Sequence, residues 1–547
     1  MAETTVAGWI GAALAKDAGI RTVFGVVGSG NFQLVNALTG HGARFVAARH
    51  EGAAAAMADA WARVSGEVGL LTVHQGPGLT NALTGLAEAA MSRTPLLVLA
   101  AEATAPGGGH VDQAALAAAV GVIPDRVTAA STVRNDLRRA YRTALVERRT
   151  VLLSLPLDVQ AQPADDDALP EIRVWPRLWP APETVTAVAD ALARAQRPLF
   201  LAGRGARQAK ADLKQLAERT GALLVTTTAC RGLFRGEEFS LDVSGAFATP
   251  AAAALIAGAD LVIAWGCALS PLVTGNGTLI GDGTTVVQVD ASPAALGARH
   301  RVDLGIPSDA ATAARAVTAE LDRRGQRAQG YRTPEVSRRL AAGRRWRDVP
   351  FTPETEPGRI DPRTLTIALD DLLPAERTVA TDSGNFMGYP ALFLDVPDED
   401  GLVFTQAFES VGLGLATALG AAIARPDRLT VAALGDGGAL MSGGELETAV
   451  RLGIGGLLVV VYNDEANGTE VHRFGPLGYP LANVRFPAAD FARIAAGYGC
   501  AAVTVRRVAD LAPVSAWLDG DRARPLLIDA KVTRRAPAWW LAPAGGD

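Results

Sequence analysis

Two polar side chains follow two apolar runs in the third part of the chain. Asp436 lies in the glycine turn Gly435–Gly438 after one run, and Asn463 follows the next run. Between them, Glu445–Arg451 carries apolar residues at helical spacing. Parallel strands joined by a helix place ligands at their carboxyl ends, so we expect Asp436 and Asn463 to lie side by side. Carboxylate and amide oxygens suit Mg²⁺, and the turn offers N–H donors, so this unit predicts a Mg²⁺–diphosphate site.

Taken by itself, the Gly-Asp-Gly turn also fits a tight turn with a solvated aspartate. The composite GDG, ELETAVR and N is more specific, because it resembles the thiamine-diphosphate (ThDP) motif of the acetolactate synthase and pyruvate decarboxylase superfamily. The resemblance implies that Asp436, Asn463 and Glu465 hold the metal. It also implies cofactor contacts for Gly384, Asn385, Phe386, Gln406, Val411, Gly435, Gly437, Gly438, Asn467 and Gly468. Val411 takes the position of the apolar residue that bends the cofactor, where many relatives have Met, Leu or Ile.

A glutamate in the first part of the chain is the candidate acid–base group. Glu51 follows a short apolar run and begins a helical pattern, where an acid by itself is stabilised as a helix N-terminal residue. The stretch RHEGAAAAMADAWAR resembles the acetolactate synthase helix whose glutamate hydrogen-bonds the cofactor's aminopyrimidine. That resemblance implies a catalytic, cofactor-binding role for Glu51. The Gly76-Pro77-Gly78 turn matches the family's GPG pattern, which implies that Gly76 and Pro77 contact the cofactor.

Further polar residues are candidates for contact with the substrate. His74 and Ser29 match a histidine and a serine that face the substrate in benzoylformate decarboxylase, although His74 equally fits a cap on its turn. His110 lies in the glycine-rich loop 106–110, a region where pyruvate decarboxylases keep a histidine pair. Glu470 and His472 follow the metal turn, near the place of a catalytic glutamate in pyruvate decarboxylases, with surface charge as the alternative.

Alternating apolar runs and helical patterns predict an α/β protein with three doubly wound parallel-sheet domains. We expect a pyrimidine-binding domain at residues 1–162, a middle domain at 183–325, a diphosphate-binding domain at 360–535 and a tail at 536–547. Stretches rich in Pro join the domains. Exposure of the pair Trp539-Trp540 to water would be costly, so we expect it to pack on a neighbour or to cover a pocket.

Composition excludes several classes of protein. Of 547 residues, 49% are hydrophobic and 20% are charged, so large cores can form. A formal net charge of −5 gives no general basic field, which argues against nucleic acid as a main partner. No apolar run reaches membrane-spanning length, and the acid near the N-terminus does not fit a signal peptide. Three scattered cysteines fit a reducing compartment, so we expect a cytoplasmic protein.

The departures from acetolactate synthase shape the expected activity. The middle domain has Gly266-Cys-Ala-Leu-Ser-Pro271 in place of the Arg-Phe-Asp-Asp-Arg type of segment of FAD-binding relatives, so FAD is disfavoured. Gly28-Ser29-Gly30 lacks the third glycine of a nicotinamide site. We expect a ThDP- and Mg²⁺-dependent decarboxylating carboligase that acts on a 2-oxo acid and a second carbonyl acceptor. The alternatives are a simple 2-oxo-acid decarboxylase of the benzoylformate type and a non-catalytic subunit. The resemblance implies a homodimer or homotetramer with sites between chains.

Overall fold

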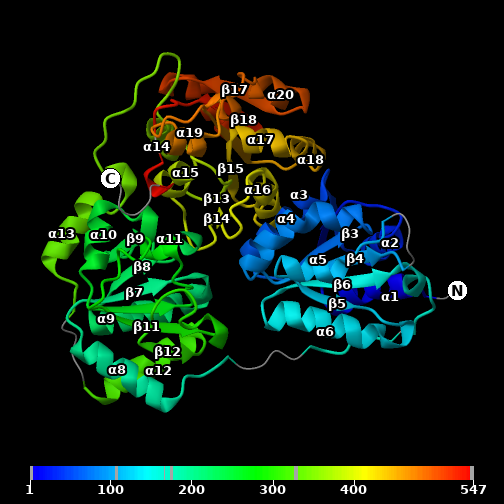
Figure 1. Ribbon diagram of the computed structural model, residues 1–547, viewed down its shortest axis with the longest axis horizontal. Helices are drawn as coiled ribbons and strands as arrows, with labels where there is room; N and C mark the ends of the chain where they lie inside the picture. The colour runs from blue at the N-terminus through cyan, green and yellow to red at the C-terminus, as the bar shows by residue number, and fades with distance from the viewer. Residues whose placement is uncertain are drawn as a thin grey trace. The chain divides into compact units, whose positions relative to one another are not determined.

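The computed structural model describes residues 4–104, 109–165, 167–172, 177–325, 330–536 and 538–541. Within these residues the strands form three six-stranded sheets with helices packed on them (Figure 1). The first sheet has the order β2-β1-β3-β4-β6-β5. Its strands are β1 (Thr22–Gly25), β2 (Arg44–Ala47), β3 (Gly69–Val73), β4 (Leu96–Glu102), β5 (Ile123–Arg126) and β6 (Thr150–Pro156).

The second and third sheets complete the predicted fold class. The second has the order β12-β11-β10-β7-β8-β9, and the third has the order β14-β13-β15-β16-β18-β17. The second contains β7 (Pro198–Ala202), β8 (Leu223–Thr226), β9 (Ser240–Val243), β10 (Leu261–Trp265), β11 (Thr285–Asp290) and β12 (Leu304–Pro307). The third contains β13 (Arg377–Thr381), β14 (Leu402–Phe404), β15 (Leu429–Gly435), β16 (Leu457–Asn463), β17 (Ala501–Val505) and β18 (Leu526–Lys531). The first and third sheets share one strand order. The three sheets, each with its helices, confirm the predicted three α/β domains.

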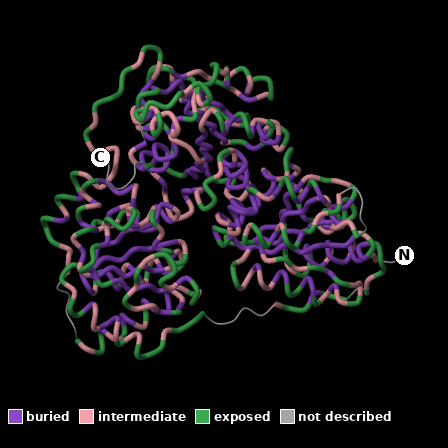
Figure 2. Tube along the Cα trace, viewed as in Figure 1, coloured by how far each residue is buried: buried purple, intermediate pink, exposed green. Residues whose placement is uncertain are grey.

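Most strands are apolar and buried because helices cover the faces of the sheets. In the first sheet, α1 (Val6–Ala12) and α6 (Val133–Val146) pack on one face, where Ile10 and Leu137 join a buried cluster with strand residues. The helices α3 (Glu51–Ser65) and α4 (Pro77–Met91) cover the other face (Figure 1). Buried residues accordingly follow the strands in Figure 2. This layering leaves the carboxyl ends of the strands as the places where loops can gather.

The chain forms two compact units that do not follow the sequence continuously. One unit combines the first sheet with residues 378–387 and 405–532, so it holds both parts in which site residues are predicted. The other unit combines the middle segment with residues 388–404 and the C-terminal residues. The domain boundaries given above stay a prediction.

Some elements differ from the sequence expectation. The turn after β15 is the start of α17 (Asp436–Ser442), because Gly435 caps a helix that begins at Asp436 itself. The helix α13 (Pro334–Gly343) lies inside the stretch expected to be a linker, and Thr333 caps it. Trp540 is buried and packs on Tyr389 of its own unit, with ring centroids 4.9 Å apart. Across the described ranges, no helix combines the length and apolar character needed to cross a membrane.

Candidate functional site

Strand register brings the two predicted metal ligands to adjacent positions. Gly435 of β15 pairs with Tyr462 of β16 in a parallel ladder, so Asp436 and Asn463 follow at the next position of neighbouring strands. Asn463 is fully buried, and its Nδ2 donates to Asp529 Oδ1 at 2.9 Å, which fixes the orientation of its amide. Asp436 accepts a hydrogen bond from its neighbour Gly437 N at 2.8 Å.

The carboxylate of Asp436 lies in a poorly solvated place. Burial raises its pKa to about 6, against the opposing effect of backbone N–H groups of Gly437, Glu465 and Ala466. The carboxylate therefore faces the turn after β16, where Glu465 has φ 59° and its carbonyl accepts from Phe486 N at 2.9 Å. Among the described residues, no group of three or more His, Cys, Asp or Glu side chains gathers to bind a metal. One carboxylate, one amide and main-chain oxygens fit a Mg²⁺ ion that completes its shell with phosphate and water.

Asp382 organises this site, and the sequence analysis did not single it out. Its buried carboxylate accepts hydrogen bonds from Ser383 N at 2.9 Å and Gly412 N at 3.0 Å. Burial raises its pKa to about 6, with backbone N–H groups opposing the shift. A Cβ atom added at Gly438 would lie 2.1 Å from Asp382 Oδ2. Asp382 thus joins the loop after β13, the loop before α16 (Gly414–Ala424) and the first turn of α17.

Glycines give the predicted cofactor residues room to meet. The rings of Phe386 and Tyr462 stack with centroids 5.3 Å apart, and a Cβ at Gly435 would lie 3.1 Å from Phe386. A Cβ at Gly468 would lie 2.9 Å from Asn385 Cβ. Ser383 Oγ donates to Gln406 Oε1 at 3.4 Å. A Cβ added at Gly437 would lie 3.9 Å from Asn467 Oδ1, and one added at Gly438 would lie 3.3 Å from Val411 Cγ1. Gly384 has φ 137°, which favours glycine. We call residues 384–386, Gln406, Val411, residues 435–438, Asn463, Asn467 and Gly468 the cradle.

In the part of this unit formed by the first sheet, Glu51 and His74 meet at the first turn of α4. Glu51 is half-buried, and its Oε2 accepts from Asn81 Nδ2 at 3.0 Å. A Cβ at Gly78 would lie 3.6 Å from Glu51 Oε1 and 3.2 Å from His74 Cβ. His74 Nδ1 accepts from Gly30 N at 3.1 Å, so this histidine does hold the loop after β1. Pro77 begins α4, and Gly76 before it has φ 66°.

The other candidates lie at more open positions. Ser29 and His110 are exposed, and His110 Nδ1 lies 3.0 Å from Ala103 O. Residues 106–108 of the loop that precedes His110 lie outside the described residues. Glu470 and His472 are half-buried on α19 (Gly468–Phe474), which begins in the cradle. Burial lowers the pKa of His472. A neutral, half-buried imidazole can give or take a proton near neutral pH.

The helix α18 (Glu445–Arg451) holds the loop that presents Glu51. Glu445 is buried, and its Oε1 accepts from Arg49 N at 2.9 Å and His50 N at 3.1 Å. Arg451 Nη2 donates to Ala47 O at 2.6 Å. These contacts explain the ELETAVR motif, whose residues fix the stretch just before Glu51. We call the contacts of Glu445 and Arg451 with the backbone of residues 47–50 the α18 clamp.

A second contact joins the same two parts of the chain. Glu88 Oε2 of α4 accepts from Ala407 N at 3.0 Å and Phe408 N at 2.8 Å, beside Gln406 of the cradle. Arg63 donates to the other oxygen of Glu88 at 2.9 Å. Despite these links, no hydrogen bond or ion pair among the described residues joins Glu51 to Asp436. The structure therefore brings the cradle and the Glu51 region into one unit without a direct hydrogen bond between these two side chains.

Comparison with known proteins identifies three matching regions. Family models match at residues 4–119 (thiamine pyrophosphate enzyme, N-terminal TPP binding domain), 185–317 (central domain) and 382–530 (C-terminal TPP binding domain). A probable 2-ketoarginine decarboxylase of Pseudomonas aeruginosa is 31% identical over 93% of the chain and 90% of its own length. An acetolactate synthase large subunit of Parasynechococcus marenigrum is 30% identical over 83% and 76%. A sulfoacetaldehyde acetyltransferase of Alcaligenes xylosoxydans xylosoxydans is 27% identical over 90% and 87%.

Proposed function

This chain belongs to the thiamine pyrophosphate enzymes, and we propose that it uses ThDP and Mg²⁺ to decarboxylate a 2-oxo acid and to join the remaining fragment to a second carbonyl compound. The observation that carries the proposal is that one unit holds both the cradle and a positioned Glu51. The cradle offers oxygen donors and N–H groups to a metal diphosphate, and the α18 clamp fixes the backbone that presents Glu51.

The chain's own residues supply binding and proton transfer. Bound ThDP supplies a nucleophilic carbon and an electron sink for the electrons released with CO₂. Asp436 and Asn463 would hold the Mg²⁺, and the cradle glycines would admit the diphosphate. Glu51 would exchange a proton with a ring nitrogen of the pyrimidine, and Asn81 holds its carboxyl group for that task. These roles need Glu51 ionisable and Asp436 ionised at working pH.

Carboligation is the leading proposal because the chain resembles an acetolactate synthase over most of its length. The relatives named above are called a decarboxylase, a synthase and an acetyltransferase, so the proposal does not specify the acceptor. Simple decarboxylation is the second candidate, and it has a specific observation in its favour. Glu470 and His472 place half-buried acid–base groups on the helix that starts in the cradle. Such groups can protonate the fragment left by CO₂ and release an aldehyde.

We further propose that the active site forms between two copies of the chain. Among the described residues no hydrogen bond or ion pair joins Glu51 to Asp436, so the two groups can belong to different sites. Apolar side chains beside the cradle support this proposal, because Leu440 is 58% exposed and Met441 is 71% exposed. Phe408 and Val411 are also exposed. A second copy would remove this apolar surface from water.

FAD is not part of the proposal. In an open α/β sheet, a dinucleotide binds where the strand order reverses, which in the second sheet is between β7 and β10. There the loops approach closely: Gly205 N donates to Gly266 O at 3.1 Å, and a Cβ at Gly203 would lie 2.4 Å from Gly266 O. A flavin band in the visible spectrum of the purified protein would contradict this part of the proposal.

The test is a product analysis with defined substrates. The protein, loaded with ThDP and Mg²⁺, is incubated with pyruvate, benzoylformate or 2-ketoarginine, each alone and with an aldehyde acceptor. CO₂ release and products are followed by coupled assay and mass spectrometry. A 2-hydroxy ketone or 2-hydroxy acid product supports carboligation, whereas an aldehyde alone supports the second candidate. CO₂ release from none of a broad panel of 2-oxo acids would count against both.

A further inference from the structure

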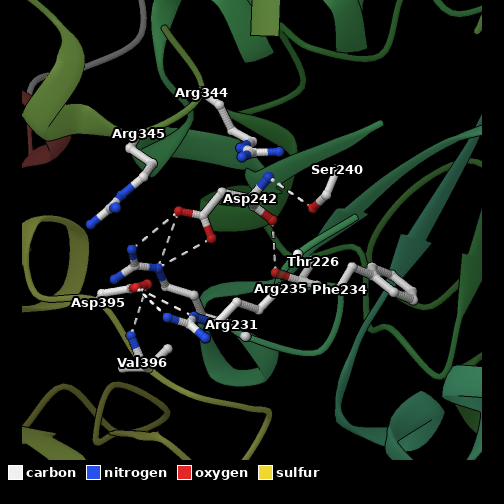
Figure 3. A pocket seen from close by; sticks show the side chains of 12 residues that line it. Thr226, Arg231, Phe234, Arg235, Ser240, Asp242, Arg344, Arg345, Asp395 and Val396 are labelled. Atoms are coloured by element: carbon white, nitrogen blue, oxygen red, sulfur yellow. Dashed lines mark hydrogen bonds and ion pairs between the residues drawn. The ribbon is translucent and has the colours of Figure 1, made fainter. Parts of the chain in front are cut away.

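The second unit contains a cavity of about 340 Å³ that belongs to none of the groups described above. It lies beside the edge strand β9 and is formed by the turn after β8, the residues after α13 and a segment that precedes β14. Four arginines and two aspartates line it: Arg231, Arg235, Arg344, Arg345, Asp242 and Asp395. In Figure 3, Arg344 and Arg345 lie on one side of Asp242, and Asp395 lies on the other. We call this cavity the arginine pocket.

Arg231 is committed to the fold. Its side chain is 3% exposed, and its Nη1 donates to Leu394 O at 2.7 Å and to Ala391 O at 2.5 Å. Its Nε donates to both carboxylate oxygens of Asp242 at 3.2 Å. Arg235 pairs with Asp395, with Nη2 to Oδ2 at 2.9 Å, and is 46% exposed. The two aspartates therefore offset these two arginines.

Arg344 and Arg345 are different because most of their donors are unused. Arg344 Nη1 donates to Glu237 O at 3.0 Å, and Arg345 Nη2 donates to Asp370 Oδ2 at 3.2 Å. The Nε and remaining terminal nitrogen of each have no hydrogen-bond partner among the described residues. Asp370 also pairs with Arg347 and Arg377, so its single charge is shared among three guanidinium groups. The two arginines thus bring donor groups to the pocket that nothing in the fold requires.

The charges that line the pocket do not balance. Four guanidinium groups face two carboxylates, which leaves a surplus of two positive charges. The surplus of positive charge affects the pKa of Asp395, which burial by itself would raise. Arg235, Arg345 and Arg231 nevertheless hold the pKa of Asp395 below its ordinary value. Guanidinium groups bind phosphate oxygens with paired, charge-assisted hydrogen bonds, and they do so better than ammonium groups do.

We propose that the arginine pocket binds a phosphate monoester dianion, with Arg344 and Arg345 as its main donors. The double negative charge matches the surplus, and the cavity volume leaves space for a small organic group attached to the phosphate. All lining residues belong to the second unit, whereas the cradle and the α18 clamp belong to the first. Binding is therefore expected with ThDP already in place.

The experiment titrates inorganic phosphate and glycerol 2-phosphate into the full chain saturated with ThDP and Mg²⁺, by calorimetry at constant ionic strength with chloride as the balancing anion. We expect one saturable site per chain for both probes. The double substitution Arg344→Ala/Arg345→Ala should weaken binding by about tenfold or more for each arginine removed. Because Asp370 keeps Arg347 and Arg377, the variant should fold, and circular dichroism checks this. Arg345→Lys, which keeps the charge but not the paired donors, should weaken binding less.

The matched control is Arg338→Ala/Arg339→Ala. These two arginines are exposed on α13, so their loss changes the net charge equally near the same place. Retained binding in this control, together with weakened binding in the pocket variant, supports the site. Absence of saturable binding to the wild-type chain, or an equal loss in both double variants, would overturn it. Neither result depends on the substrate proposed above for the cofactor site.

Discussion

At the scale of single residues, the partners of a carboxyl group decide what it does. Asp382 and Asp436 are both poorly solvated, and burial raises the pKa of each to about 6. Asp382 accepts backbone N–H groups from two loops and therefore fixes their positions. Asp436 instead sits beside Asn463 at the carboxyl ends of two strands, with the turn at Glu465 in front of it. The first therefore has a structural role, and the position of the second fits the metal-binding role proposed for it.

The first prediction concerns Glu51. Glu51→Gln keeps the size of the side chain and its contact with Asn81 but cannot exchange a proton. The rate of hydrogen–deuterium exchange at C2 of bound ThDP should fall by about 10²–10⁴, measured by acid quench and NMR, while ThDP affinity stays close to wild type. Glu67→Gln, the same change at an exposed site after α3, is the control. An unchanged exchange rate in Glu51→Gln would return Glu51 to the role of a helix-terminal acid.

The second prediction concerns the metal ligands. Asp436→Ala and Asn463→Ala each remove an oxygen donor, so a Mg²⁺ ion would no longer bridge the diphosphate to the protein. Both variants should lose ThDP during gel filtration in Mg²⁺ buffer, measured as cofactor per chain. Asp427→Ala removes an exposed carboxylate at the turn before β15 and should retain the cofactor. Full occupancy in both site variants would rule out this metal assignment.

At the scale of elements, α18 connects the segment that presents Glu51 to the part of the chain that holds the cradle. The helix is short, and the two residues that bind the backbone before Glu51 lie at its ends: Glu445 in the first turn and Arg451 in the last. Those positions also suit the helix macrodipole. Glu445 and Arg49 are 396 positions apart in the chain, yet the clamp sets the backbone from which Glu51 projects. A change in the clamp should therefore alter proton transfer more than it alters cofactor retention.

The third prediction tests this positioning role. Glu445→Ala leaves the N–H groups of Arg49 and His50 without their acceptor, at a cost of about 1–3 kcal/mol. C2 exchange should slow, although less than in Glu51→Gln, with a smaller change in ThDP affinity. Glu445→Gln retains an acceptor oxygen and should recover most of the rate. Glu447→Ala is the control: it removes the solvent-accessible pairs with Arg49 and Arg451, which contribute little, and leaves the bonds of the clamp to the backbone in place. Equal losses of rate and affinity in Glu445→Ala would point to general disruption instead.

The fourth prediction concerns pH and Asp382. Its folded pKa of about 6 lies above its ordinary value of 3.8, so the folded chain binds this proton more tightly than the unfolded chain does. The stabilisation is complete below about pH 4 and is lost as the pH rises through about 6, a change of about 3 kcal/mol. Asp382→Asn does not titrate. Its free energy of unfolding relative to wild type should therefore improve between pH 4 and pH 7, as measured by urea denaturation. Parallel pH curves for the two proteins would contradict it.

At the scale of the whole molecule, the chain separates cofactor chemistry from the middle segment. The first unit unites residues from the beginning and the end of the chain, held by the α18 clamp, by Glu88 and by the packing of α3 on α16. A Cβ at Gly420 of α16 would lie 2.2 Å from Met57 O of α3, which shows how closely these helices pack. The second unit carries the arginine pocket. The separation allows a ligand of the second unit to be studied while the cofactor site is full.

The fifth prediction tests whether sites form between copies. Glu51→Gln and Asp436→Ala chains should each be inactive alone. If each site takes Glu51 from one chain and Asp436 from another, then a mixed dimer contains one site without either substitution. Unfolding and refolding the two variants together should restore about a quarter of wild-type activity. Refolding each variant separately before mixing is the control. Mixtures that remain inactive, although mixed dimers are detected by native mass spectrometry, would show that one chain supplies both groups.

The sequence by itself determined the fold class, the strands around the metal turn and the identity of the candidate acid–base and metal residues. These features are local: apolar runs define buried strands, and Gly-Asp-Gly and Arg-His-Glu occur at the ends of such runs. Less regular elements were missed, as with β5, whose residues alternate between half-buried and exposed, and α13, which lies in an arginine-rich stretch.

The tertiary structure alone decided the contacts between distant segments. Three examples join residues far apart in the chain. Asp382 lies against Gly438, Glu445 binds the backbone of Arg49, and Arg344 lines the same pocket as Arg231. Periodicity specifies which face of an element is apolar, but it does not specify which loops meet when several sheets assemble. A buried carboxylate that accepts backbone N–H groups has no sequence signature beyond the acid itself, because its partners are the same in every residue type except proline.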